Sequence, residues 1–142
     1  MPGLFTDGVR KVMRLAKEQA RRLNHEWLDT HHILLGLSKD ATNLASTVLN
    51  NFDINYRMIR LEVDKIIPSG PDSIGGEQLP MTPCAKQAIR YSIEEAEKLS
   101  HSHVGTEHLL LGLMRDKENV AAQVLANLGL TLHELRGEVQ NR

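Results

Sequence analysis

The ten residues LDTHHILLGL at positions 28–37 return at positions 104–113 as VGTEHLLLGL, 76 residues further along the chain. Sliding the whole chain against itself by 76 residues aligns many other positions without a gap. The aligned pairs include Thr6/Thr82, Arg14/Arg90, Leu23/Leu99, His25/His101, Thr30/Thr106 and His32/His108. Self-similarity at one fixed offset indicates a duplicated supersecondary unit. Two copies predict two halves related by a pseudo-twofold axis, because an open solenoid usually needs at least three repeats.

Each copy is predicted to form four helices, since its apolar residues recur with a period near 3.6. Thr6 and Thr82 are placed to cap the first helix of their copies. Thr30 and Thr106 are predicted to cap the short helices that carry the LLGL element. The last helix of the second copy opens with TLHE at 131–134, which is a capping-box pattern.

No segment alternates with a period of two over a useful length, so no strand is predicted. The fold class is therefore all-α, with eight helices in two pseudo-twofold-related four-helix repeats. We expect a single domain over 1–142, with a first repeat at 4–67 and a second repeat at 81–142. The segment PSGPDSIGGEQLP at 68–80 is rich in Gly and Pro and is predicted to be a linker.

The LLGL leucines are predicted to be core residues, because each contributes roughly 1.5–3 kcal/mol when fully buried. Gly36 and Gly112 within this element would allow either close helix packing or the exit turn.

Composition narrows the class of protein. A net charge of −1 over 142 residues favours neither nucleic acid nor an anionic membrane as a partner. The first residues lack the apolar stretch of a signal peptide, and the one cysteine, Cys84, fits a reducing compartment. We therefore expect a cytoplasmic location. Cys84 follows a predicted helix start, where the helix dipole would lower its pKa, but no base or oxyanion site accompanies it. No enzyme activity is predicted.

The doubled pattern of F-T, a long amphipathic helix, GTEHLLLGL and VAAQVLANLGL closely resembles the Clp N-terminal repeat domain of ClpC-type AAA+ unfoldases. The resemblance covers nearly the whole chain. It implies a non-catalytic domain that receives unfolded or tagged protein substrates and adaptor proteins. In the family this domain precedes two ATPase modules that feed a partner peptidase. The chain has no G-x-x-x-x-G-K-[ST] phosphate loop, so ATP hydrolysis is not expected of it. The alternative is a free-standing regulator that binds adaptors or the Clp machine.

Some ClpC-type domains bind phosphorylated arginine in two equivalent pockets, and the resemblance implies a similar site here. Thr82 would hold the phosphate at a helix N-terminus, and Glu107 would hold the guanidinium. The first repeat keeps Thr6 but has His31 in place of the glutamate, and a neutral imidazole offers at most one acceptor nitrogen. We therefore expect a competent second repeat and a degenerate first repeat. The alternative is a purely structural role, in which each threonine only caps its helix and stabilises it by about 1 kcal/mol.

The histidines raise the question of a metal site. The equivalence of His25 with His101, and of His32 with His108, favours a structural role in each half. The adjacent His31 and His32 are expected to point to different sides of a helix, whereas helical ligand pairs prefer a spacing of three or four. No metal site and no cofactor are predicted, with metal binding as the alternative.

Overall fold

The computed structural model describes residues 4–70 and 79–141, and eight α-helices follow one another within them. Their bounds are α1 (Asp7–Arg22), α2 (Thr30–Lys39), α3 (Leu44–Asn51), α4 (Tyr56–Ile66), α5 (Pro83–Lys98), α6 (Thr106–Arg115), α7 (Val120–Asn127) and α8 (Leu132–Gln140). Each helix of the first repeat begins 76 residues before its counterpart in the second, as Asp7 and Pro83 illustrate. The predicted all-α fold of two related four-helix repeats is confirmed. Residues 71–78 of the predicted linker lie outside the described residues.

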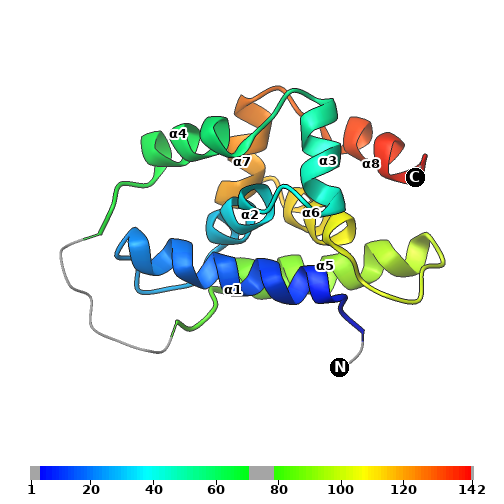
Figure 1. Ribbon diagram of the computed structural model, residues 1–142, viewed down its shortest axis with the longest axis horizontal. Helices are drawn as coiled ribbons and strands as arrows, with labels where there is room; N and C mark the ends of the chain where they lie inside the picture. Colours follow the sequence, from blue (N-terminus) through cyan, green and yellow to red (C-terminus); the bar gives the residue numbers. More distant parts are fainter. Residues whose placement is uncertain (1–3, 71–78, 142) are drawn as a thin grey trace.

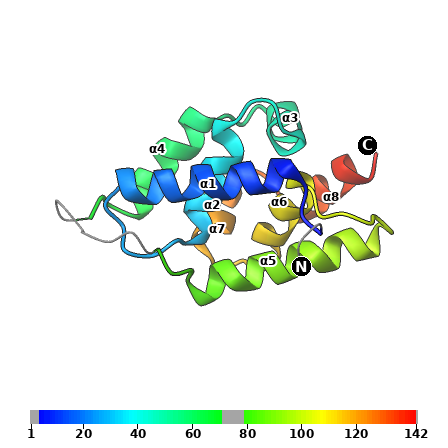
Figure 2. The ribbon, with the colours of Figure 1, turned by 60° about the horizontal axis from the view of Figure 1, so that its bottom comes forward.

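The short helices α2 and α6 occupy the centre of the molecule (Figure 1), where α1 packs on α2 and α5 packs on α6. Helices α3, α4, α7 and α8 lie on the other side of this central pair from α1 and α5. Figure 2 shows the two long helices, α1 and α5, flanking α2 and α6. None of the helices in the described ranges combines the length and the apolarity that a bilayer span requires.

The LLGL leucines are buried, as predicted. Their exposed fractions are all 0–1%. The six side chains are Leu34, Leu35, Leu37, Leu110, Leu111 and Leu113. Because α2 and α6 are covered on nearly every side, they supply the centre of a core shared by both repeats.

The glycines of the LLGL element allow close helix packing rather than an exit turn. Helix α2 continues beyond Gly36 to Lys39. A Cβ atom on Gly36 would lie 2.7 Å from the carbonyl oxygen of Val12 in α1. A Cβ on Gly112 would overlap the carbonyl oxygen of Ala88 in α5. Each repeat therefore brings its first helix against the backbone of its second.

Two isolated parallel β-bridges join the repeats, and no other strand pairing occurs within residues 4–70 and 79–141. One bridge pairs Phe5 with Val104, and the other pairs Leu28 with Met81. Each connects the start of one repeat to the loop before the short helix of the other. As a result, the N-terminus of α1 lies beside α6, and the N-terminus of α5 lies beside α2.

Thr6, Thr82 and Thr131 cap their helices as predicted. The prediction that Thr30 and Thr106 do so is wrong. The N-caps of α2 and α6 are Asp29 and Gly105, one residue earlier.

Each of these two threonine hydroxyls instead accepts a backbone N–H from the opposite repeat. Thr106 Oγ1 accepts from Ala45 N at 3.1 Å, and Thr30 Oγ1 accepts from Ala121 N at 3.2 Å. Ala45 and Ala121 lie in the first turns of α3 and α7, where backbone N–H groups lack a partner within the helix. The two threonines thus cap helices across the pseudo-twofold axis.

Candidate functional site

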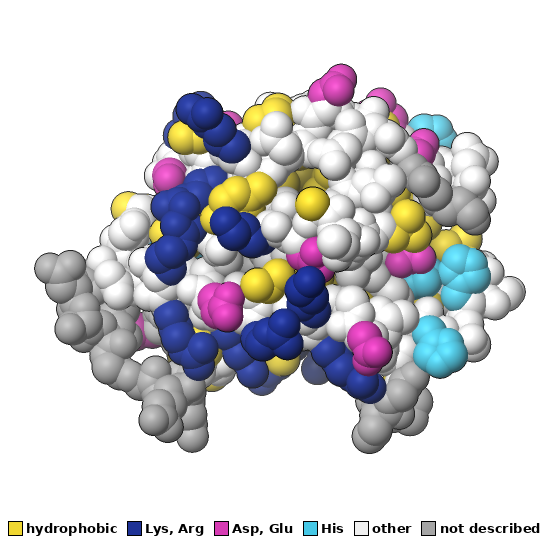
Figure 3. Space-filling view, viewed as in Figure 1, with side chains coloured by type: hydrophobic (Ala, Val, Ile, Leu, Met, Phe, Trp, Pro, Cys, Tyr) yellow, Lys and Arg dark blue, Asp and Glu magenta, His cyan; other side chains and the backbone are white. Residues whose placement is uncertain are grey.

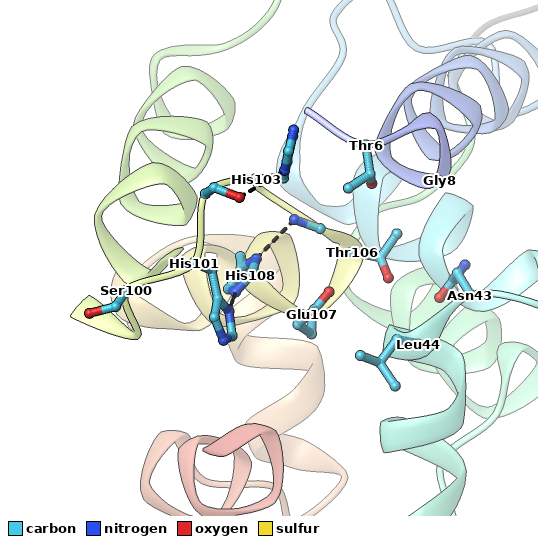
Figure 4. A pocket seen from close by; sticks show the side chains of 12 residues that line it. Thr6, Gly8, Asn43, Leu44, Ser100, His101, His103, Thr106, Glu107 and His108 are labelled. Carbon is cyan, nitrogen blue, oxygen red and sulfur yellow. Dashed lines mark hydrogen bonds between the residues drawn. The ribbon is translucent and has the colours of Figure 1, made fainter. Parts of the chain in front are cut away.

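A hollow of about 590 Å³ lies at the N-terminus of α6, and both repeats line it (Figure 4). Thr6, Gly8, Asn43 and Leu44 come from the first repeat. The second repeat contributes Ser100–His103 and Gly105–His108. Thr6 and Glu107 therefore share one pocket.

This grouping differs from the sequence prediction, which placed Thr82 with Glu107 in the second repeat. Thr82 instead lies beside α2, where its hydroxyl donates to Asp29 Oδ1 at 2.7 Å. The backbone N–H of Thr82 donates to Leu28 O, as that of Thr6 donates to Val104 O. Each threonine thus lies next to the other repeat: Thr6 lines the same hollow as Glu107, and Thr82 bonds to Asp29, two residues before His31.

The Glu107 pocket combines a carboxylate with two helix N-termini. Glu107 is half-buried in the first turn of α6, and its carboxylate lies where a Cβ on Gly105 would overlap it. Thr6 caps α1 by accepting from the backbone N of Val9 at 3.3 Å. The first-turn N–H groups of a helix favour an anion, whereas a carboxylate favours a guanidinium. One pocket therefore offers contacts for both charges.

The first repeat has a carboxylate at the position equivalent to Gly105. Asp29 stands where the second repeat has Gly105, and its Oδ1 accepts from the backbone N of Thr30 and the hydroxyl of Thr82, both at 2.7 Å. An anion entering here would meet the Asp29 carboxylate, and it would compete with that carboxylate for the Thr82 hydroxyl. Sequence reasoning missed Asp29, although the signal was present in the contrast between LDTH at 28–31 and VGTE at 104–107.

His31 is the repeat equivalent of Glu107, but it is less accessible to solvent than Glu107. It is 3% exposed. Burial lowers the pKa of His31 to about 4, against the opposing effect of the Asp29 carboxylate, and proximity to His25 lowers it further. His31 is therefore neutral at neutral pH and presents no carboxylate to a guanidinium.

The repeat-equivalent histidines form the same hydrogen-bonded pair in both halves. His25 Nδ1 lies 2.7 Å from His32 Nε2, and His101 Nδ1 lies 2.7 Å from His108 Nε2. The Nδ1 atoms of His32 and His108 accept the backbone N–H of the N-cap residue three positions earlier. Each pair thereby ties the start of a short helix to the loop before it.

The expectation that His31 and His32 point to different sides of their helix is wrong. Their ring centroids lie only 3.9 Å apart. Both rings sit in the first turn of α2, and a nitrogen of each approaches Nδ1 of His25. Both rings thus turn toward His25, which lies in the loop before α2.

The expected lowering of the Cys84 pKa is also wrong. Partial desolvation and the nearby carboxylates of Asp29, Asp116 and Glu118 raise the pKa of this thiol. The Cys84 thiol is thus less ionised at neutral pH than an ordinary thiol, although the residue is exposed.

A second hollow, of about 580 Å³, lies between α1 and α5. Its apolar lining is Phe5, Val9, Met13, Met81, Ile89 and Leu109. Arg10, Arg14 and Lys17 of α1 add cationic groups to the same hollow. Lys and Arg side chains gather along the lower part of the molecule in Figure 3, where α1 lies in Figure 1.

Comparison with known proteins points to one family. The family described as the Clp repeat (R) N-terminal domain matches residues 4–141. The chain is 47% identical over 135 residues to chaperone protein ClpC1 of Arabidopsis thaliana chloroplasts; the match covers 95% of the chain but only 14% of that relative.

Solved structures agree on the fold. The N-terminal domain of the chaperone ClpD from Arabidopsis thaliana superposes with a TM-score of 0.79 at 19% identity, covering 98% of this chain and 94% of that one. A ClpV N-domain in complex with a VipB peptide superposes with a TM-score of 0.77 at 11% identity, covering 96% and 84%.

Proposed function

Because the chain belongs to the family of Clp repeat N-terminal domains, we propose that it is the docking module of a Clp-type ATP-dependent protein unfoldase. In this role it receives protein substrates and adaptor proteins and performs no catalysis itself. ATP hydrolysis would belong to other modules of the longer protein, and degradation to a partner peptidase. The peptide-bound ClpV N-domain, which shares the fold, supports a binding role.

The ligand that the Glu107 pocket fits best is phosphoarginine within a substrate chain. Its guanidinium would pair with the Glu107 carboxylate, and its phosphoryl group would face Thr6 and the N-terminus of α1. Gly8 leaves room there, since a Cβ added to it would already lie 3.4 Å from Thr106 Cγ2. The observation that carries this proposal is that the pocket is lined by Glu107 and by the N-terminus of α1 together.

Calorimetry with free phosphoarginine tests the pocket. A hydrogen bond to a charged group contributes about 1.5–3 kcal/mol, so Glu107→Gln should weaken binding about 10- to 100-fold. His31→Gln, the matched change in the other repeat, should leave the affinity unchanged. Equal affinity of the wild type and Glu107→Gln would refute the assignment.

The first repeat offers a gain-of-function test. His31→Glu alone should add no second site, because Asp29 still occupies the Thr82 hydroxyl. The double change Asp29→Gly with His31→Glu reproduces the second-repeat residues and should raise the stoichiometry from one to two. A stoichiometry of two in the single variant would contradict the role given to Asp29.

The hollow between α1 and α5 would serve apolar segments of an unfolded chain, with its cations favouring acidic neighbours. Met13 lies half-buried in its lining. Met13→Glu should weaken binding of a fluorescently labelled unfolded protein while preserving the affinity for free phosphoarginine. Loss of both, or of neither, would argue against two separate contact sites.

A further inference from the structure

Three histidines of the first repeat converge on one point, which the second repeat does not reproduce. The ring nitrogens of His25, His31 and His32 that face one another all lie within 4.8 Å. His25 Nδ1 is 3.4 Å from His31 Nε2 and 2.7 Å from His32 Nε2. In the second repeat Glu107 replaces the middle histidine, which leaves only a pair.

We propose that His25, His31 and His32 bind a divalent transition-metal ion of the class that prefers imidazole, such as Zn²⁺. Two nitrogens bound to a tetrahedral zinc ion at about 2.0–2.1 Å lie roughly 3.4 Å apart. The separation of His25 Nδ1 and His31 Nε2 has this value without any movement. These two atoms are therefore already spaced to bind one ion.

The surroundings of the outer ring nitrogens of this pair suit metal binding. His25 Nε2 lies 3.0 Å from the carbonyl oxygen of Pro68, which places the ring proton on Nε2 and leaves Nδ1 unprotonated, with its lone pair facing His32 Nε2. His31 Nδ1 is buried without a hydrogen-bond partner among the described residues, and the nearest carboxylate oxygen, Asp29 Oδ2, is 4.0 Å away. A proton on His31 Nδ1 would face that carboxylate and would leave Nε2 free to bind the ion. A carbonyl partner such as that of His25 usually accompanies a metal-binding histidine, and a small shift of the Asp29 side chain would give His31 a carboxylate partner.

His32 joins as the third ligand only at a cost. Its Nδ1 accepts the backbone N–H of Asp29 at 2.9 Å, so its proton is on Nε2 and is donated to His25 Nδ1. An ion on His25 takes the lone pair that this bond uses. Coordination by His32 then requires its proton to move to Nδ1 and its bond to Asp29 N–H to break. Metal binding thus competes with the capping of α2, and the site should bind more weakly than a preformed structural zinc site.

An ion can reach this cluster from the surface. His31 and His32 are buried, but His25 is half-exposed and Pro68 is exposed, which gives an ion a route from the surface. The site is independent of the proposed docking function.

Calorimetry with ZnCl₂ and the visible absorption of bound Co²⁺ test the site on untagged protein. The wild type should bind one ion per chain, and Co²⁺ should show the intense bands of tetrahedral coordination. His31→Gln should weaken Zn²⁺ binding at least tenfold and abolish those bands. His103→Gln, at an exposed histidine outside the cluster, should change neither.

His25→Gln provides a second variant at a half-exposed position, with thermal unfolding by circular dichroism to confirm that each variant folds. It should weaken binding as His31→Gln does. Absence of Zn²⁺ binding by the wild type would overturn the proposal. Wild-type affinity in a folded His31→Gln or His25→Gln protein would overturn it equally.

Discussion

Alanine at Gly36 or Gly112 should destabilise the protein, although helix propensity alone predicts the opposite. In an exposed helix interior, Gly→Ala is favourable by about 1 kcal/mol. At Gly36 the new Cβ would lie 2.7 Å from Val12 O and 3.0 Å from Ala16 N. Both are backbone atoms, so no side chain can rotate away. Ordinary van der Waals contact begins near 3.4 Å, and α1 and α2 would therefore have to separate by about 0.7 Å.

Overpacking of this kind usually costs about 1–3 kcal/mol, which exceeds the propensity gain. Gly112→Ala should cost more than Gly36→Ala, since its Cβ would lie 2.7 Å from Ser92 N and would also overlap Ala88 O. Gly137→Ala in α8 is the matched control, because its Cβ would meet nothing within 4 Å. It should stabilise the protein by up to about 1 kcal/mol.

Urea unfolding of the three variants measures these changes, and an unchanged slope would confirm that only the free energy of unfolding has moved. If Gly36→Ala and Gly112→Ala are as stable as Gly137→Ala, then α1 and α2, and likewise α5 and α6, do not pack as closely as described.

Three further predictions concern stability. Thr106→Val keeps the volume but leaves Ala45 N–H buried without its acceptor; urea unfolding should show a loss of about 1–3 kcal/mol that Thr106→Ser does not share, and equal losses would refute the capping role. The pKa values of His31 and His32, about 4 and about 2, lie below the ordinary 6.5, so only the unfolded chain takes up these protons as the pH falls below 6.5. The free energy of unfolding should therefore drop by about 4 kcal/mol between pH 7.5 and pH 5. Urea unfolding at the two pH values measures this drop, and an unchanged urea midpoint would contradict it. Gly129→Ala should lower stability by about 1–2 kcal/mol in thermal unfolding through its φ of 91° alone, because its Cβ would meet no atom within 4 Å.

The helices and three of their N-caps, Thr6, Thr82 and Thr131, were predictable because their causes are local. A threonine hydroxyl three residues before a backbone N–H is visible in the sequence, and so is an apolar period of 3.6. Thr30 and Thr106 are exceptions, because their hydroxyls accept hydrogen bonds from Ala121 N and Ala45 N, 91 and 61 residues away. A local sequence pattern cannot predict so distant a partner.

The candidate site shows the same division. Glu107 and Thr6 were both singled out, but each was assigned to a pocket within its own repeat. The bridge between Phe5 and Val104 brings them together instead. The histidine cluster likewise depends on the loop that turns His25 toward α2, which helical spacing could not reveal. The cytoplasmic location and the domain boundaries stay predictions.

By itself the sequence determined the helical class, the duplication and the buried leucines, since periodicity, capping and the 76-residue offset are properties of neighbouring residues or of the chain compared with itself. Only the tertiary structure decided that the start of each repeat lies beside the short second helix of the other repeat. Backbone hydrogen bonds and helix packing across the pseudo-twofold axis set that pairing, and they place Thr6 in one pocket with Glu107 and bring Thr82 into a hydrogen bond with Asp29.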